Sequence, residues 1–123
     1  MSVPVLKQGE FLIATIQGAL TDADLVELRD VLADRTGRLR SRALLLDVSA
    51  LDVMDSFSTR MLRNIAFTAR LRGAETVVVG IQPDVALTMV QLGLTLEGVE
   101  TALDFEEGMA LLSRRLSQGR RAT

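Results

Sequence analysis

The sequence contains neither cysteine nor histidine, and these two absences remove most of the chemistry that small domains perform at neutral pH. Without cysteine there are no disulfides, no thiolate nucleophile and no zinc–thiolate site. Without histidine the chain lacks the usual general base, the usual metal ligand and every Ser-His-Asp or Cys-His arrangement. Since Lys7 is also the only lysine, catalysis would fall to carboxylates and arginines alone. We therefore expect that the chain is not an enzyme and carries no cofactor or metal.

Aromatic residues are scarce, long apolar runs are absent, and the charge is nearly balanced. Hydrophobic residues make up 48% of the 123 residues but aromatics only 3%, so the core must consist of Leu, Val, Ile, Ala and Met. This composition argues against disorder, and the length suits one domain. A net charge of −2 argues against nucleic-acid binding, which usually needs a basic surface. With no membrane-length apolar run and no signal-like N-terminus, we expect no membrane association and a cytoplasmic location.

The spacing of apolar residues predicts a single α/β domain in the order β-β-α-β-α-β-α-β-α. The two first strands form a hairpin, and buried runs separated by helices indicate a mainly parallel sheet with an antiparallel start. The expected strands cover residues 3–6, 10–16, 43–46, 75–81 and 98–102, and the expected helices start after Thr21, Asp55, Gln82 and Asp104.

The two last helices are each expected to bury one apolar face. The expected buried side chains are Val85, Met89, Val90 and Leu92 in the first of them, and Phe105, Met109, Leu112 and Leu116 in the second. The final helix should end near Leu116, which divides the domain (1–123) into a core of about residues 3–116 and a flexible tail at 117–123. Arg114, Arg115, Arg120 and Arg121 then form a solvated C-terminal group.

The stretch 43–71 organises the chain. A wholly apolar strand ends at Asp47, a polar link follows, and Asp55 then precedes a helical pattern as its N-cap. The apolar face of that helix comprises Phe57, Met61, Leu62, Ile65, Ala66 and Ala69. Ser56 accordingly takes the first helical position, where outward N–H groups and the helix dipole favour an anion.

Two other groups of charged residues have a functional and a structural interpretation. Asp47, Asp52 and Asp55 could form a carboxylate Mg²⁺ site, although aspartate performs turn and cap chemistry routinely. The arginines of 38–42 could form a phosphate- or acid-binding patch, and a solvated connector is the default interpretation. The three arginines are Arg38, Arg40 and Arg42.

The strand, the Asp-x-Ser that follows it, the turn Asp55-Ser56-Phe57-Ser58 and the amphipathic helix together resemble the STAS domain, the anti-sigma-factor antagonist family. The run 80–94 strengthens the resemblance, which covers about residues 3–116. The commoner turn in that family is Asp-Ser-Ser/Thr-Gly. The departure here, Phe57-Ser58, resembles the stressosome scaffold branch of the family, the RsbS type.

The resemblance implies that Ser56 is phosphorylated by a cognate serine kinase, whereas local physics alone would make it only a helix-start serine. Ser58 and Thr59 are the competing acceptors, and Ser58 is expected to hydrogen-bond back to Asp55. The switch loop that contacts a partner is expected to comprise Asp52, Asp55, Phe57, Ser58 and Thr59.

The sequence and its resemblance leave three possible functions for this chain. The first is a scaffold that joins RsbR-like paralogues in a stressosome, holds an RsbT-like serine/threonine kinase, releases it when Ser56 is phosphorylated, and is reset by a phosphatase. The second is a simple antagonist that binds an anti-sigma kinase directly. The third, a small enzyme or nucleotide-binding domain, is disfavoured because the chain has no phosphate loop and no histidine. The first strand could pair with another copy in a homo-oligomer, or simply complete the sheet.

Overall fold

The computed structural model describes residues 3–18 and 20–122, with the backbone alone for 119–122. Its elements are β1 (Val5–Gln8), β2 (Phe11–Thr15), α1 (Asp22–Arg38), β3 (Ala43–Asp47), α2 (Ser56–Leu71), β4 (Glu75–Val79), α3 (Pro83–Gln91), β5 (Glu100–Ala102) and α4 (Phe105–Ala122). The predicted α/β class and the predicted order of elements are confirmed.

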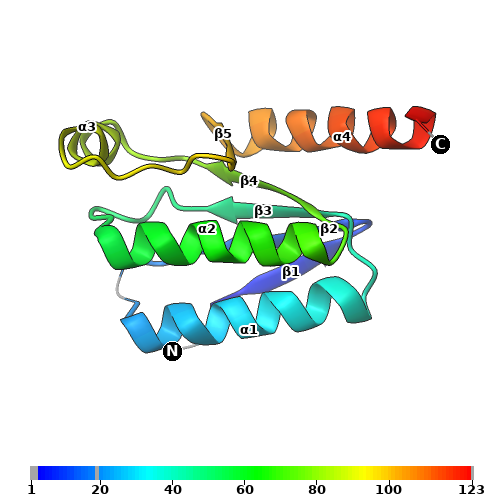
Figure 1. Ribbon diagram of the computed structural model, residues 1–123, viewed down its shortest axis with the longest axis horizontal. Helices are drawn as coiled ribbons and strands as arrows, with labels where there is room; N and C mark the ends of the chain where they lie inside the picture. Colours follow the sequence, from blue (N-terminus) through cyan, green and yellow to red (C-terminus); the bar gives the residue numbers. More distant parts are fainter. Residues whose placement is uncertain (1–2, 19, 123) are drawn as a thin grey trace.

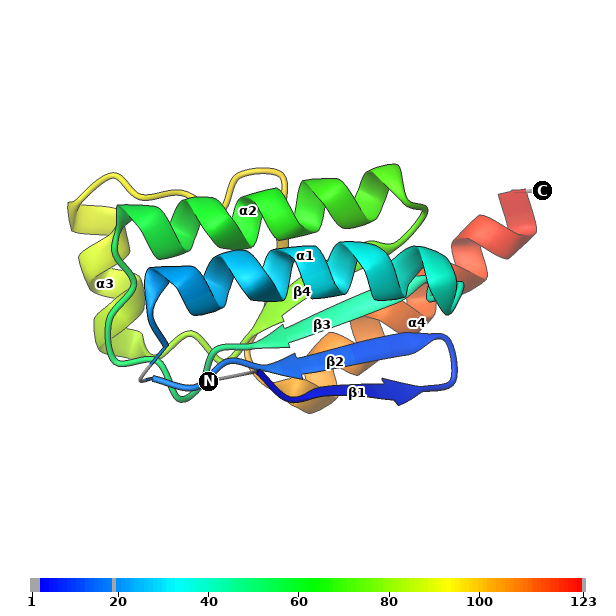
Figure 2. The same cartoon turned by 90° about the horizontal axis from the view of Figure 1, so that it is seen from below.

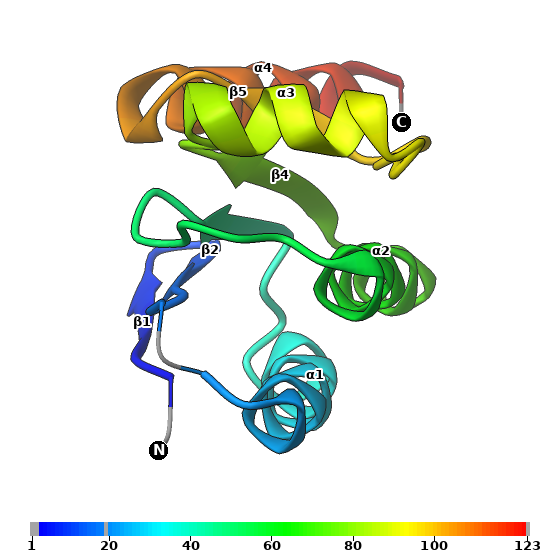
Figure 3. The same cartoon turned by 90° about the vertical axis from the view of Figure 1, so that its left-hand side faces the viewer.

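A five-stranded sheet with the order β1-β2-β3-β4-β5 forms the middle layer (Figures 1 and 2). β1 and β2 pair antiparallel, and every other neighbouring pair is parallel. The helices α1 and α2 lie side by side on one face, while α4 covers the other face and α3 lies at one end (Figures 2 and 3). The carboxyl ends of the parallel strands therefore share the edge that faces the start of α2.

The central strand β3 is buried on both of its faces, as its unbroken apolar run predicts. Leu44 and Leu46 belong to the apolar cluster under α1 and α2, and the same cluster takes in the buried side chains of α3. Ala43 and Leu45 belong to the smaller cluster under α4. The alternation of side chains along one strand thus connects two separate cores.

The expected helix start after Thr21 is confirmed by its cap. The Asp24 backbone N–H donates to Thr21 Oγ1 at 3.1 Å, and the Thr21 N–H donates to Asp24 Oδ2 at 2.9 Å. Each side chain thereby satisfies a backbone donor of the other residue, which is a capping box with aspartate in the usual glutamate position.

The predicted buried face of α3 is wrong for two of its four residues. Val85 and Met89 are buried, but Val90 is 78% exposed and Leu92 is 65% exposed. The reason is position: α3 has only nine residues and sits at the end of the sheet, so one side of it packs on the core and no second layer covers the other. Leu87 on the same helix is exposed as well.

The last helix also departs from the prediction at both of its ends. Phe105 is exposed because α4 meets the sheet one turn later, at Gly108, where an added Cβ would lie 2.4 Å from Val79 Cγ1. The helix runs to Ala122 and does not stop near Leu116. Arg115 pairs with Glu100. Arg120 and Arg121 have side chains outside the described residues, and the flexibility of 117–123 stays a prediction.

Two glycines flank the loop that leaves β3. An added Cβ at Gly18 would lie 2.8 Å from the Ala50 carbonyl oxygen. At Gly80, whose φ is +82°, it would lie 2.9 Å from Ser49 Cβ and 3.3 Å from Asp47 Oδ1. The loop after β3 is therefore packed between the segments that follow β2 and β4, and only glycine leaves room for it. Within the described part of the chain, no helix is both long and apolar enough to span a membrane.

We expect Gly80→Ala to destabilise the protein more than Gly73→Ala. Both glycines have positive φ, but a Cβ at Gly73 would meet nothing within 4 Å, so that variant carries only the backbone cost of about 1–2 kcal/mol. Gly80→Ala adds the clash with Ser49, for a further loss of about 1 kcal/mol or more. Urea denaturation of both variants measures the difference, and equal losses would contradict this packing.

Candidate functional site

The loop between β3 and α2 is tied to the loop that follows β4. Asp47 Oδ1 accepts a hydrogen bond from the Ser49 backbone N–H at 2.9 Å, which turns the chain as it leaves β3. Gln82 donates from Nε2 to the Ser49 carbonyl oxygen at 2.8 Å and to Asp52 Oδ1 at 3.3 Å. Both loops lie at the carboxyl edge of the parallel strands, where open α/β sheets carry their sites.

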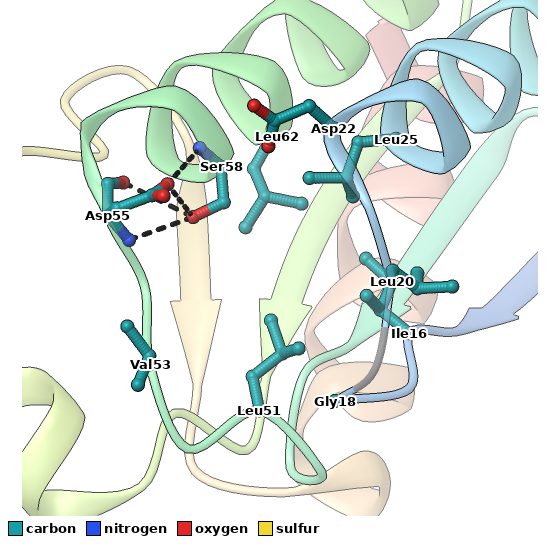
Figure 4. A pocket seen from close by; sticks show the side chains of 10 residues that line it. All are labelled: Ile16, Gly18, Leu20, Asp22, Leu25, Leu51, Val53, Asp55, Ser58 and Leu62. Carbon is teal, nitrogen blue, oxygen red and sulfur yellow. Dashed lines mark hydrogen bonds between the residues drawn. The ribbon is translucent and has the colours of Figure 1, made fainter.

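Asp55 and Ser58 exchange hydrogen bonds around the start of α2 (Figure 4). The Ser58 backbone N–H and the Ser58 hydroxyl each donate to Asp55 Oδ1 at 2.8 Å. The Asp55 N–H donates in return to Ser58 Oγ at 3.0 Å. This is a capping box in which serine replaces the usual glutamate. It confirms the predicted N-cap and the predicted bond from Ser58 to Asp55, and it occupies the Ser58 hydroxyl.

The same hydrogen bonds favour the ionised form of Asp55. The Ser58 backbone N–H contributes most and the Ser58 hydroxyl next, and together they hold the pKa of the Asp55 carboxyl below its ordinary value of 3.8. A charged carboxylate at this point also interacts favourably with the positive end of the helix dipole. The cap is therefore ionic at neutral pH.

The three hydroxyls of the turn differ in their surroundings. Ser56 is exposed at the first position of α2, and its hydroxyl has no hydrogen-bond partner among the described residues. Ser58 is half-buried in the cap, and Thr59 is only 2% exposed. Of the other predicted loop residues, Asp52 and Asp55 are exposed, while Phe57 is half-buried and packs on the core. The structure thus brings the predicted residues together but leaves Thr59 beneath the surface.

Two hollows flank the start of α2, and acidic side chains line one of them while basic side chains line the other. One, of about 180 Å³, is lined by Asp55 and Ser58 together with Asp22 from the start of α1 (Figure 4). The other, of about 340 Å³, is lined by Ser56, Arg60 and Arg63 from α2.

Sequence reasoning missed both arginines of the second hollow. Their spacing was an available signal, because residues four and seven positions after Ser56 share its face of a helix. It also missed Val53, which is 74% exposed in the loop.

The geometry supports neither the Mg²⁺ site nor the phosphate-binding arginine patch that the sequence allowed. The described residues hold no group of three acidic side chains that could bind a metal ion, so Asp47, Asp52 and Asp55 do not form one. Arg38 pairs with Asp34 at 3.3 Å, and both side chains are well exposed. The segment 38–42 precedes β3, so it lies at the opposite end of that strand from the loop that carries Ser56.

Comparisons with known proteins agree on one family. The profile of the STAS domain matches residues 2–107. A serine-to-glutamate variant of RsbS from Moorella thermoacetica has a similar structure, with 33% identity, 94% of this chain and 97% of that chain covered, and a TM-score of 0.80. A chain of a stressosome structure is 34% identical, with 92% and 98% covered and a TM-score of 0.78.

A curated relative is longer than this chain. The RsbT co-antagonist protein RsbRD of Bacillus subtilis is 29% identical over 77 residues, which are 63% of this chain and 28% of that protein. The chain therefore spans about a quarter of the length of that relative.

We expect the stability of the protein to fall in acid partly through Asp55. Because the pKa of Asp55 is lowered in the folded state, its stabilising contribution is complete well above pH 3.8 and is lost as the pH falls through 3.8 and below. Asp55→Asn keeps a capping side chain without the charge, so its free energy of unfolding should fall less than that of the wild type between pH 6 and pH 3. Asp55→Ala should lose about 1 kcal/mol at pH 6. Urea titrations at both pH values measure these differences, and parallel losses in wild type and Asp55→Asn would contradict the ionic cap.

Proposed function

This chain belongs to the STAS domain family, and from that membership and the geometry of the β3–α2 loop we propose that it is a non-catalytic regulatory scaffold switched by phosphorylation of Ser56. The RsbS and stressosome likenesses cover more than nine-tenths of the chain, which supports the scaffold branch of the family. The proposed setting is the cytoplasm, in a stress-response pathway.

The exposed, unengaged hydroxyl of Ser56 is the observation that carries the proposal. A kinase must bring an acceptor oxygen into line with the γ-phosphate of ATP, so a suitable hydroxyl has to be accessible. Ser58 uses its proton in the cap, and Thr59 is buried. Phosphorylation of either would require α2 to lose its start. Ser56 needs no such rearrangement.

The proposed reaction needs no catalytic group from this chain. Ser56 Oγ attacks the γ-phosphorus of ATP held by the kinase, the bond to the β,γ-bridging oxygen breaks, and ADP leaves. The hydroxyl proton passes to a base of the kinase. The side chain of Ser56 is exposed, and so are those of its neighbours Asp52, Val53, Asp55 and Arg60. Together they form the surface that a docking kinase would meet.

Release of the partner follows from the charge that the phosphate brings. It adds about −1.5 to −2 charges and three acceptor oxygens at the start of α2. If Ser56 lies within the interface, this charge must be desolvated or the contact must open. The positive end of the helix dipole keeps the modified domain folded. The complex then loses affinity while the scaffold persists.

The proposed partners are RsbR-like paralogues, an RsbT-like serine/threonine kinase and a phosphatase that resets Ser56. The match to RsbRD supports a paralogue with the same domain. Exposed apolar side chains support a large assembly, since they leave surface to be covered by other subunits. They lie on α3 and directly after it, at Leu87, Val90 and Leu92, and around the start of α4, at Leu103 and Phe105.

A simple antagonist that binds an anti-sigma kinase directly is the second candidate. It has the same fold and the same acceptor, and it would stay monomeric or dimeric. Uncovered apolar surface on α3 favours the scaffold over this alternative. Light scattering of the protein mixed with its RsbR-like paralogue separates the two, because only the scaffold forms a large particle.

We expect the cognate kinase and ATP to modify Ser56 and no other residue of the turn. Mass spectrometry of the wild type should place one phosphate on Ser56, and Ser56→Ala should abolish it. Ser113→Ala, at an exposed serine of α4, is the matched control and should be modified like the wild type. Phosphate on Ser58 or Thr59, or none with a kinase that is active on another substrate, would reject Ser56 as the acceptor.

We expect Ser56→Asp to weaken binding of the kinase by at least about tenfold, which corresponds to about 1.4 kcal/mol. The negative charge would enter the interface, whereas the same substitution at Ser113 adds the same charge away from the loop. Titration calorimetry with each variant gives the two dissociation constants. Wild-type affinity in Ser56→Asp would show that Ser56 lies outside the interface.

A further inference from the structure

The second hollow beside the start of α2 is built from segments far apart in the chain. Ser56, Thr59, Arg60 and Arg63 line it from the first two turns of α2, and residues 93–95 close it from the segment that follows α3. That segment, drawn in yellow, runs along α2 (Figure 2), and Arg70 holds it by donating to the Gly98 carbonyl oxygen at 2.8 Å. The hollow has a volume of about 340 Å³, which is ample for a phosphoryl group.

The charges around this hollow are of one sign. Its lining carries two guanidinium groups, Arg60 and Arg63, and no carboxylate. Neither arginine has an ion-pair or hydrogen-bond partner among the residues that the structure describes. The nearest acid in sequence, Asp55, lines the hollow on the other side of the helix start. An anion that enters beside Ser56 would therefore meet attraction from both arginines.

Two buried polar atoms in the lining also lack partners. Thr59 is 2% exposed, and its Oγ1 accepts and donates no hydrogen bond within the described residues. The Nε of Arg63 is buried and unpaired in the same way. A buried donor left unpaired is destabilising, so each such group calls for an explanation. A phosphate oxygen would accept from both.

We propose that the phosphoryl group on Ser56 docks in this hollow, bound by the guanidinium groups of Arg60 and Arg63 and by the hydroxyl of Thr59. The inference rests on the proposed function and deepens it by assigning the groups that receive the phosphate. Residues four and seven positions after Ser56 face it along the helix, and guanidinium binds phosphate through paired N–H donors. The modified loop thus has its own defined arrangement, in which the phosphate lies on the face of α2 that carries both arginines.

The test uses protein with phosphoserine installed at position 56 during translation, so no kinase takes part. A ³¹P NMR titration gives the second pKa of the phosphate, which is about 6 without neighbours. Arginines within contact should lower it, as they lower a carboxyl pKa. We expect the pKa in the otherwise unchanged protein to be lower than in Arg60→Gln/Arg63→Gln by about half a unit or more. Arg114→Gln, which removes an exposed charge from α4, should leave it unchanged.

Equal pKa values in the unchanged protein and in the double variant would overturn the docking. Arg60→Gln alone, at an exposed position, should give part of the shift and guards against misfolding of the double variant. A second arm titrates the unmodified protein with inorganic phosphate. If free phosphate shifts the amide signals of Gly93 and Thr95 while phosphoserine shows no dependence on the arginines, the hollow serves a phosphate from outside and our proposal is wrong. Because the kinase is absent, these outcomes leave the proposed function untouched, and failure of the kinase to modify Ser56 tests that function separately.

Discussion

The hydrogen bonds between Asp55 and Ser58 set where α2 begins, and the candidate site depends on that position. The Asp55 carboxylate takes the backbone donor of Ser58, so the helix starts at Ser56. One residue earlier or later, a different hydroxyl would face solvent. The cap also engages the Ser58 hydroxyl, which leaves the Ser56 hydroxyl as the accessible one among the three in the turn. In the switch that we propose, the bonds that stabilise the start of α2 would therefore also select the modification site.

The start of α2 has an acidic side and a basic side, and this division would favour the basic side for a phosphate on Ser56. Asp55 faces the hollow shared with α1, whereas Arg60 and Arg63 face the hollow shared with the segment after α3. Repulsion from the nearby carboxylates would thus be only part of the electrostatics. A partner that contacts this surface would meet a different charge pattern once the serine is modified, and no change in the fold is required for that difference.

Most of the fold could be predicted because it depends on local signals. The apolar run of β3, the caps of α1 and α2, and Pro83 at the start of α3 each lie within a few residues of the feature they specify. The exposed faces of α3 and of the start of α4 could not be predicted. An apolar side chain such as Val90 contributes to the periodic pattern whether or not another layer covers it, and α3 lies at the end of the sheet, where none does.

The sequence by itself determined the class of fold, the start of α2 and the position of Ser56, since capping acts over three residues and strand burial shows as an apolar run. Only the tertiary structure decided the surroundings of that serine. Gln82 reaches Ser49 across 33 positions, and Gly80 lets the two loops meet. Residues 93–95 come to lie beside Arg60 and Arg63 through the path of the chain after α3. Such contacts leave no periodic pattern in the sequence, because they join residues far apart in the chain and depend on how the layers pack.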